Sequence, residues 1–278
     1  MEHSVATKGV RLESVFDRVD VAPGVAMPRL GLGTSRAYGR ELVKAIVAAF
    51  GMGYRLVDTS ANYENEEDVG RAIALSDVPR EELFITTKLE GPDQGLESPR
   101  YALESSLRRL GLAYVDLYLI HWPEPRLTND TWQAMERLQR HGLTRSIGVS
   151  NFEVSDLEQL LSTATIPPAV NQIKLNPTEA RHDLAEYCAD RGIAVEAWAP
   201  VLRGRASDVP TLVRIGRDHG KTAAQVSLRW LLQKGMIAIP KSVHEGRLRE
   251  NADIYDFELS EDELAAIGSA DRPHVRLW

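Results

Sequence analysis

The chain has 278 residues, of which 43% are hydrophobic, and its formal net charge is −7. That is enough apolar material for one large buried core, and the length is typical of a single barrel enzyme. The basic residues are interspersed with acidic ones, which argues against a nucleic-acid binder that neutralises phosphates. The single cysteine excludes a disulfide framework, and because no apolar run approaches a membrane-spanning length, no membrane partner is expected.

The N-terminal part of the chain predicts a tail followed by a hairpin. Residues 1–20 carry charges throughout and lack the apolar stretch of a secretory signal, so we expect a cytoplasmic protein. Residues 1–11 are expected to be a flexible N-terminus. Two apolar runs, at residues 15–19 and 21–25, then predict a β-hairpin within residues 12–30.

From Leu30 onward, short apolar runs alternate with longer helical patterns, and no linker rich in Pro, Gly or Ser interrupts them. Eight strands are expected, at residues 30–33, 55–58, 84–88, 116–121, 146–149, 169–173, 194–197 and 237–239. Helical patterns lie at residues 41–52, 66–75, 99–110, 129–140, 155–161, 182–191, 222–233 and 261–267. Eight βα units predict a (β/α)8 TIM barrel, with a doubly wound open sheet as the competing topology. Residues 1–278 would then form one barrel domain whose bottom the hairpin closes.

Several other chemistries lack their sequence signatures. Gly51 and Gly53 follow a helical pattern, whereas a dinucleotide-binding glycine loop follows a strand and opens a helix. The seven histidines show no ligand spacing, so no metal site is expected. Ser150 lacks the second glycine of a nucleophile elbow, and Cys188 lies in a helical pattern where a buried structural thiol is expected.

Three of the expected strands end in an ionisable side chain, namely Asp58, Lys88 and His121. Side chains at the carboxyl ends of barrel strands converge on one central site. Tyr63 follows Asp58 by five residues, so the set contains a carboxylate, an amine, an imidazole and a phenol. Any one of them alone is more often a cap, a solvated end or a packed residue. Their joint placement favours proton-transfer chemistry.

Each of the four side chains has a role that its chemistry suits. Asp58 would keep Lys88 protonated through a charge-assisted hydrogen bond. Lys88 would lower the pKa of Tyr63 from its usual value of about 10, which would make the phenol a stronger acid near neutrality. His121 would donate a hydrogen bond to a substrate oxygen or relay a proton.

Four motifs resemble those of the aldo-keto reductases. The first is GYRLVDTSANYENE at residues 53–66, and the others are DLYLIHWP at 116–123, RSIGVSNF at 145–152 and IPKS at 239–242, followed by Arg247, Glu250 and Asn251. They occur in the family's order and span nearly the whole chain. Among the members, the sequence looks most similar to bacterial ones that resemble the 2,5-diketo-D-gluconate reductases.

This resemblance implies a barrel that binds NADPH without a Rossmann fold and a catalytic tetrad of Asp58, Tyr63, Lys88 and His121. The nicotinamide would pass a hydride to an aldehyde or ketone while Tyr63 protonates the oxygen. The cofactor-binding residues that it implies are Gly33, Thr34, Ser150, Asn151, Gln172, Trp198, Leu202, Lys241, Ser242, Val243, His244, Arg247, Glu250 and Asn251.

Within that set, three groups resemble different parts of the family's cofactor site. Ser150, Asn151 and Gln172 match the clamp on the nicotinamide carboxamide, and Trp198 matches the aromatic that stacks on the nicotinamide ring. The stretch from Lys241 to Arg247 resembles the adenosine 2′-phosphate site, where two cations would favour NADPH over NADH.

The chain also departs from the family pattern. Ala199 replaces a serine that is common beside the stacking aromatic. Glu90 stands where many relatives carry an aromatic residue of the substrate pocket, and an acidic group there would disfavour anionic substrates. We expect Glu90 and Trp122 to line this pocket, which a short C-terminal tail ending at Trp278 would leave open unless Trp278 folds back over it.

The resemblance leaves two other functions open. One is a binding module that senses NADPH, similar to the potassium-channel β subunits, although the complete tetrad speaks against it. The other is an alcohol dehydrogenase that works mainly in the oxidative direction, because one site catalyses both directions. The expected partner is a small-molecule carbonyl substrate, and the expected state is a monomer.

Overall fold

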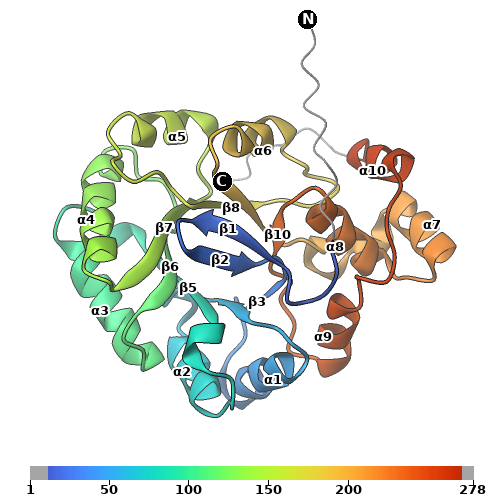
Figure 1. Ribbon diagram of the computed structural model, residues 1–278, viewed down its shortest axis with the longest axis horizontal. Coiled ribbons are helices and arrows are strands. Elements are labelled where there is room, and N and C mark those ends of the chain that lie inside the picture. The colour runs from blue at the N-terminus through green and yellow to red at the C-terminus, as the bar shows by residue number, and fades with distance from the viewer. Residues whose placement is uncertain (1–11, 271–278) are drawn as a thin grey trace, which may run out of the picture.

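The computed structural model describes residues 12–270, and its main sheet contains the eight strands expected from the sequence. They are β3 (Gly31–Gly33), β4 (Leu56–Asp58), β5 (Phe84–Leu89), β6 (Val115–Ile120), β7 (Thr144–Ser150), β8 (Val170–Lys174), β9 (Ala194–Trp198) and β10 (Ile237–Ala238). Neighbouring strands are parallel, and bridges from Leu30 to Ala238 and from Gly33 to Lys241 join the two edges. The (β/α)8 barrel is therefore confirmed and the open sheet is excluded (Figure 1).

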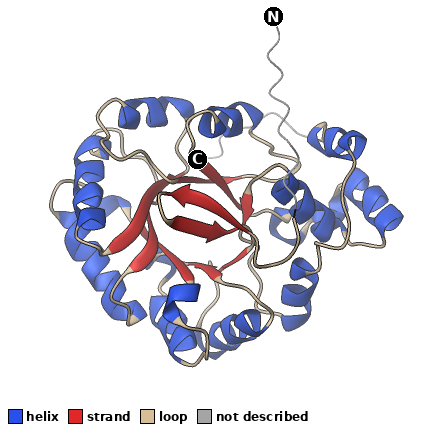
Figure 2. Ribbon diagram, in the orientation of Figure 1, coloured by secondary structure: helices blue, strands red, loops and turns tan. Residues whose placement is uncertain are grey.

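Helices surround the barrel on its outside (Figure 2). They are α1 (Gly39–Gly51), α2 (Glu66–Ala74), α3 (Ser98–Leu110), α4 (Thr128–Arg140), α5 (Val154–Leu161), α6 (His182–Ala189), α7 (Pro210–His219), α8 (Ala223–Gln233), α9 (Glu245–Ala252) and α10 (Glu261–Gly268). Short 3-10 turns include η1 (Ala61–Tyr63), η3 (Gly91–Asp93) and η4 (Leu202–Gly204). Within residues 12–270, no helix combines the length and the apolar character needed to cross a membrane.

Local sequence signals explain several helix boundaries. A capping box begins α8, because Thr222 and Gln225 satisfy each other's backbone N–H groups. Helix α7 was not predicted from the sequence. It begins at Pro210 and contains Gly216, where an added Cβ would lie 2.5 Å from the carbonyl oxygen of Lys221. This close approach to the next segment leaves room only for glycine. Because glycine is a poor helix former, its presence weakens the helical pattern in the sequence.

The predicted hairpin is present, but its turn lies later than the sequence pattern suggested. Strands β1 (Arg18–Ala22) and β2 (Val25–Pro28) are antiparallel, whereas the expected strands were residues 15–19 and 21–25. The turn falls at Pro23 and Gly24 because Gly24 has a φ of +71°, which glycine adopts readily.

The hairpin closes the amino end of the barrel, as expected. Val21, Val25 and Met27 pack in one cluster with residues at or near the starts of barrel strands, among them Leu56 and Phe84. In Figure 1 the two hairpin strands lie across the centre of the barrel. The carboxyl end of the barrel is therefore the end left for a site. The expectations for residues 1–11 and for Trp278 fall outside the described residues.

Gly148, in the third sequence motif, is required by packing inside the barrel. An added Cβ would lie 2.6 Å from the carbonyl oxygen of Val170 and 2.8 Å from Leu119 Cδ2. The backbone oxygen belongs to the neighbouring strand β8, so it cannot move away without disturbing the sheet.

Gly148→Ala should therefore destabilise the barrel by about 1 to 3 kcal/mol through overpacking. Urea unfolding followed by circular dichroism would measure the loss. Gly51→Ala is the matched control, because Gly51 ends α1 with open space around its Cα, and it should be nearly neutral. Equal stability of the two variants would contradict the packing role of Gly148.

Candidate active site

The carboxyl end of the barrel brings the four predicted side chains together. Asp58 is the last residue of β4, Lys88 lies near the end of β5, and His121 directly follows β6. Tyr63 reaches the same place because the η1 turn folds back after Ser60, whose hydroxyl accepts a hydrogen bond from the N–H of Asn62. The rings of Tyr63 and His121 meet edge to face, with their centroids 5.8 Å apart.

Lys88 is the centre of this group, and its side chain is fully buried. Its Nζ donates to both oxygens of Asp58 at 2.7 and 2.9 Å, to the carbonyl oxygen of Thr59 at 2.9 Å and to Tyr63 Oη at 3.4 Å. Burial lowers the pKa of Lys88, but its neighbours, above all the charge and the hydrogen bond of Asp58, raise it more in sum, to well above the ordinary lysine value. Lys88 is therefore a permanent cation beside the phenol.

The pKa of Tyr63 corrects one sequence-based expectation. Lys88 was expected to lower it below about 10. In the structure, burial raises the pKa of Tyr63, and the lowering by Lys88 does not cancel that effect, so the pKa lies above the ordinary value. Burial could not be read from the local sequence. The phenol therefore keeps its proton throughout the neutral range.

Beneath Asp58 lies a glutamate that sequence reasoning missed. Gln172 Nε2 donates to Asp58 Oδ2 at 2.7 Å and to Glu196 Oε2 at 2.8 Å, and so it bridges the two carboxyl groups. Burial and the charge of Asp58 raise the pKa of Glu196 to about 8. Glu196 is therefore mainly protonated at neutral pH. Its place in β9 beside Gln172 of β8 was the available signal, since residues in register on neighbouring strands project from the same face of the sheet.

Glu90 and Ser60 adjoin His121 at the rim of this group. Glu90 Oε1 lies 2.7 Å from His121 Nδ1 and accepts a hydrogen bond of 2.5 Å from Ser60 Oγ. Trp122 is 55% exposed, and its ring stacks beside that of His121 at 6.3 Å. Glu90 and Trp122 therefore flank the tetrad. Ser60 was not identified from the sequence as a site residue.

The residues matched to the carboxamide clamp also lie next to the tetrad. Asn151 Nδ2 donates to the carbonyl oxygen of His121 at 3.0 Å and to Ser150 Oγ at 3.0 Å. Trp198 is partly exposed, and its Nε1 donates to Asn151 Oδ1 at 2.9 Å. Amide groups and a flat indole are thus held together around Gln172, where they suit a flat carboxamide-bearing ring.

Two exposed cations mark a separate place between β10 and α9. Lys241 precedes the helix, Arg247 lies in its first turn, and neither forms an ion pair within residues 12–270. By contrast, Arg249 pairs with Glu245 on the same helix at 3.1 Å. Unpaired cations at a helix N-terminus favour an anion such as a phosphate.

The other residues around that helix have partners within the protein. Ser242 Oγ accepts a hydrogen bond from the N–H of His244, and Glu250 Oε1 accepts one from Thr222 Oγ1. Asn251 is buried, while Val243 is partly buried. These residues shape the loop that presents Lys241 and Arg247.

Three predicted cofactor residues have evident structural tasks. Thr34 is fully buried, and its hydroxyl donates to the carbonyl oxygen of Asp58 at 2.9 Å, so it supports the tetrad from behind. Gly33 adjoins Lys241 across the barrel closure, where an added Cβ would lie 3.0 Å from the carbonyl oxygen of Ile239. Leu202 begins η4 and packs partly buried against the outer core.

Backbone strain is concentrated on this face of the barrel. The non-glycine residues with positive φ among the described residues are Arg36, Glu64, Asn151, Arg181, Ala199, Leu202 and Arg203, and all lie in loops that follow barrel strands. Left-handed backbone costs roughly 1 to 3 kcal/mol at such positions. Strain gathered at one end of a barrel is typical of a functional face.

Glu196→Gln should alter the dependence of stability on pH. A carboxyl group with a raised pKa stabilises the fold fully below its unfolded value of 4.5, and that contribution is lost as the pH rises through the folded value of about 8. The glutamine variant lacks this loss, so its stability relative to the natural protein should grow by up to about 1.4 kcal/mol per pH unit in this window. Urea unfolding at several pH values measures the trend. The exposed Glu186→Gln should show no trend, and a flat response for Glu196→Gln would refute its protonation.

Comparisons with known proteins agree with this geometry. The model of the aldo/keto reductase family matches residues 29–272. The glyoxal reductase of Bacillus subtilis is 48% identical over 260 residues, which cover 93% of this chain and 94% of that protein.

Solved structures give the same result. The aldo/keto reductase of Brucella melitensis has a TM-score of 0.88 and 42% identity, and the match covers 92% of this chain and 99% of the other. A Bombyx mori aldo-keto reductase in complex with NADP has a TM-score of 0.87 and 37% identity, with 95% of each chain covered. The family match spans most of the chain and includes every member of the tetrad, so this protein belongs to the aldo/keto reductase family.

Proposed function

We propose that this protein reduces small aldehydes and ketones with NADPH and that Tyr63 is the general acid. The observation that carries the proposal is the position of Lys88 Nζ, which lies 2.7 Å from Asp58 Oδ1 and 3.4 Å from Tyr63 Oη. A fixed cation beside the phenol stabilises the negative charge that develops on Tyr63 as its proton leaves. Family membership supports the reaction class.

The pKa of Tyr63 suits the role of proton donor. Because burial raises that pKa, the phenol is protonated at neutral pH and is ready to donate to a carbonyl oxygen. The same phenol takes the proton back when an alcohol is oxidised, so one site serves both directions.

The residues present fit NADPH. Trp198 offers a partly exposed flat ring beside the amide of Asn151, and Lys241 and Arg247 offer two exposed cations for a phosphate. When bound, NADPH supplies the hydride that the carbonyl carbon accepts. The chain's own residues hold the two ends of the cofactor, keep the proton on Tyr63 Oη and direct the carbonyl oxygen toward it. The NADP complex of the Bombyx mori relative supports this choice.

The substrate class and setting are part of the same proposal. The Bacillus subtilis relative is named glyoxal reductase, which supports small dicarbonyl compounds as substrates of this chain. Glu90 and Trp122 at the rim would contact them. The complete tetrad speaks against a role restricted to sensing NADPH. We propose further that the chain acts as a single-domain cytoplasmic monomer.

Tyr63→Phe tests the proton donor. The natural protein should oxidise NADPH in the presence of glyoxal or other small aldehydes, and the variant should lose about two to four orders of magnitude in turnover. NADPH absorbance measures the rate, and fluorescence titration should show nearly unchanged NADPH affinity. Tyr187→Phe, on α6, is the control. If Tyr63→Phe turns over at nearly the rate of the natural protein, Tyr63 is not the proton donor. If the natural protein binds NADPH but does not oxidise it, the proposal that the protein is an enzyme is refuted.

Arg247→Ala tests the phosphate site. Loss of one cation should weaken NADPH by roughly ten- to a hundredfold, since charge-assisted contacts contribute about 1.5 to 3 kcal/mol. NADH lacks the 2′-phosphate, so its affinity should change little in the same fluorescence titration. Arg249→Ala is a matched control on the same helix, because Arg249 already pairs with Glu245. Equal losses for NADPH and NADH would count against a 2′-phosphate contact.

A further inference from the structure

Glu90 forms a carboxylate–imidazole pair with His121. The pair is joined at Nδ1 by the 2.7 Å contact, and the side chains of His121 and Glu90 are only 10% and 19% exposed. Ser60 Oγ donates to the same carboxylate oxygen. Loops after β4, β5 and β6 therefore meet at one oxygen atom. An aromatic residue, expected here from the family resemblance, could not make this contact.

The contact determines what each nitrogen of His121 can do. An ionised carboxylate accepts hydrogen bonds only, so Nδ1 must carry a proton to donate to Glu90. Nε2 lies across the ring from this contact and has no hydrogen-bond partner within residues 12–270. In the neutral ring Nε2 is an acceptor, and after a second proton binds it becomes a donor. Only the charged ring can donate to a carbonyl oxygen.

Glu90 supplies the negative charge in this pair. Burial raises the pKa of Glu90, but hydrogen bonds from His121 and Ser60 lower it more in sum, so it lies below the ordinary glutamate value. Glu90 is therefore ionised at neutral pH. An ionised carboxylate accepts the Nδ1 proton and holds the ring in one orientation.

The other charges near Glu90 mostly cancel. Lys88 pairs with Asp58, and Arg109 pairs with Glu66 at 2.6 Å. Tyr63 is neutral, because its pKa is raised. The surrounding elements therefore contribute little net charge at this rim apart from one further carboxylate.

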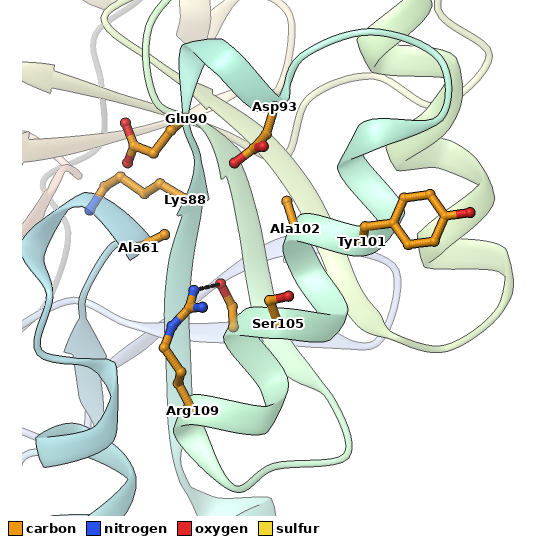
Figure 3. Close-up of a pocket in the computed structure, with 9 residues that line it drawn as sticks. Ala61, Lys88, Glu90, Asp93, Tyr101, Ala102, Ser105 and Arg109 are labelled. Atoms are coloured by element: carbon orange, nitrogen blue, oxygen red, sulfur yellow. Dashed lines mark hydrogen bonds between the residues drawn. The ribbon is translucent and has the colours of Figure 1, made fainter.

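That carboxylate is Asp93, which forms no ion pair in the described part of the chain. Glu90 and Asp93 line one cavity of about 290 Å³ beside β5 and α3, and Figure 3 shows them at the same end of it. Arg109 lies at the opposite end, hydrogen-bonded to Ser106. The end of this cavity at Glu90 and Asp93 is therefore negative.

Within the proposed carbonyl reduction, on which this inference rests, we propose that Glu90 is a positioning and specificity-determining residue. It holds His121 by Nδ1, so that Nε2 is left to face the substrate oxygen, and it disfavours anionic carbonyl substrates. An anionic substrate beside His121 would be repelled by the carboxylate of Glu90, whereas a neutral aldehyde or dicarbonyl would not.

Glu90→Gln tests both parts, because glutamine keeps the shape and a hydrogen-bond acceptor but removes the charge. The substrates are 4-carboxybenzaldehyde and its neutral methyl ester, which share the same aldehyde. The natural protein should prefer the ester in kcat/KM by about tenfold or more, and Glu90→Gln should remove most of this preference through KM for the acid. Glu97→Gln, in the same loop and 81% exposed, should leave this preference unchanged.

Two results would overturn the inference. Equal losses for both aldehydes would leave Glu90 with a merely structural role. Nitrogen-15 spectra of the histidine side chains, assigned with His121→Asn, should show a proton on His121 Nδ1, and its absence would refute the pair. This spectrum needs no turnover. If neither aldehyde is reduced by the natural protein, the proposed function fails, while the spectrum still decides whether the pair exists.

Discussion

The buried ion pair of Lys88 and Asp58 is the interaction on which the rest of this site depends. Removing two charges from water costs several kcal/mol for each ion, and only close contact with further hydrogen bonds offsets the cost. Thr59 supplies a carbonyl oxygen to Lys88, and Gln172 supplies an N–H to Asp58. The barrel makes this possible because its parallel strands deliver both ions to one end. The position of this ion pair in turn determines where the phenol of Tyr63 can contact the cation of Lys88.

The two ends of the barrel have different roles, stability at the amino end and the polar site at the carboxyl end. The hairpin fills the amino end with apolar side chains such as Met27, so that end contributes stability. The carboxyl end holds polar groups and all the left-handed non-glycine residues of the described chain. Asn151 illustrates the connection, because its left-handed backbone places an amide between His121 and Trp198. Strain at one end is tolerated because packing at the other end stabilises the whole sheet.

The sequence correctly predicted the features that depend on hydrophobic periodicity. Its predictions failed where the burial of a side chain determines the outcome. Eight strands and the convergence of Asp58, Lys88 and His121 follow from apolar runs and the geometry of parallel strands. The direction of the Tyr63 pKa shift was wrong, because desolvation arises from segments distant in the chain. The hairpin turn was misplaced since apolar residues extend past Pro23. The contact between Glu90 and His121 joins two loops, and no local pattern reports it.

One cause explains why both Tyr63 and Glu196 hold their protons. The polar layer already contains one negative charge, on Asp58, and one positive charge, on Lys88, so a second anion would be uncompensated in a buried space. Glu196 avoids that state by keeping its proton, and Tyr63 avoids it until a reaction consumes its proton. The phenolate can then form because Lys88 is nearest to it. This polar layer therefore opposes a second negative charge before the reaction and allows one only at Tyr63 Oη during the reaction.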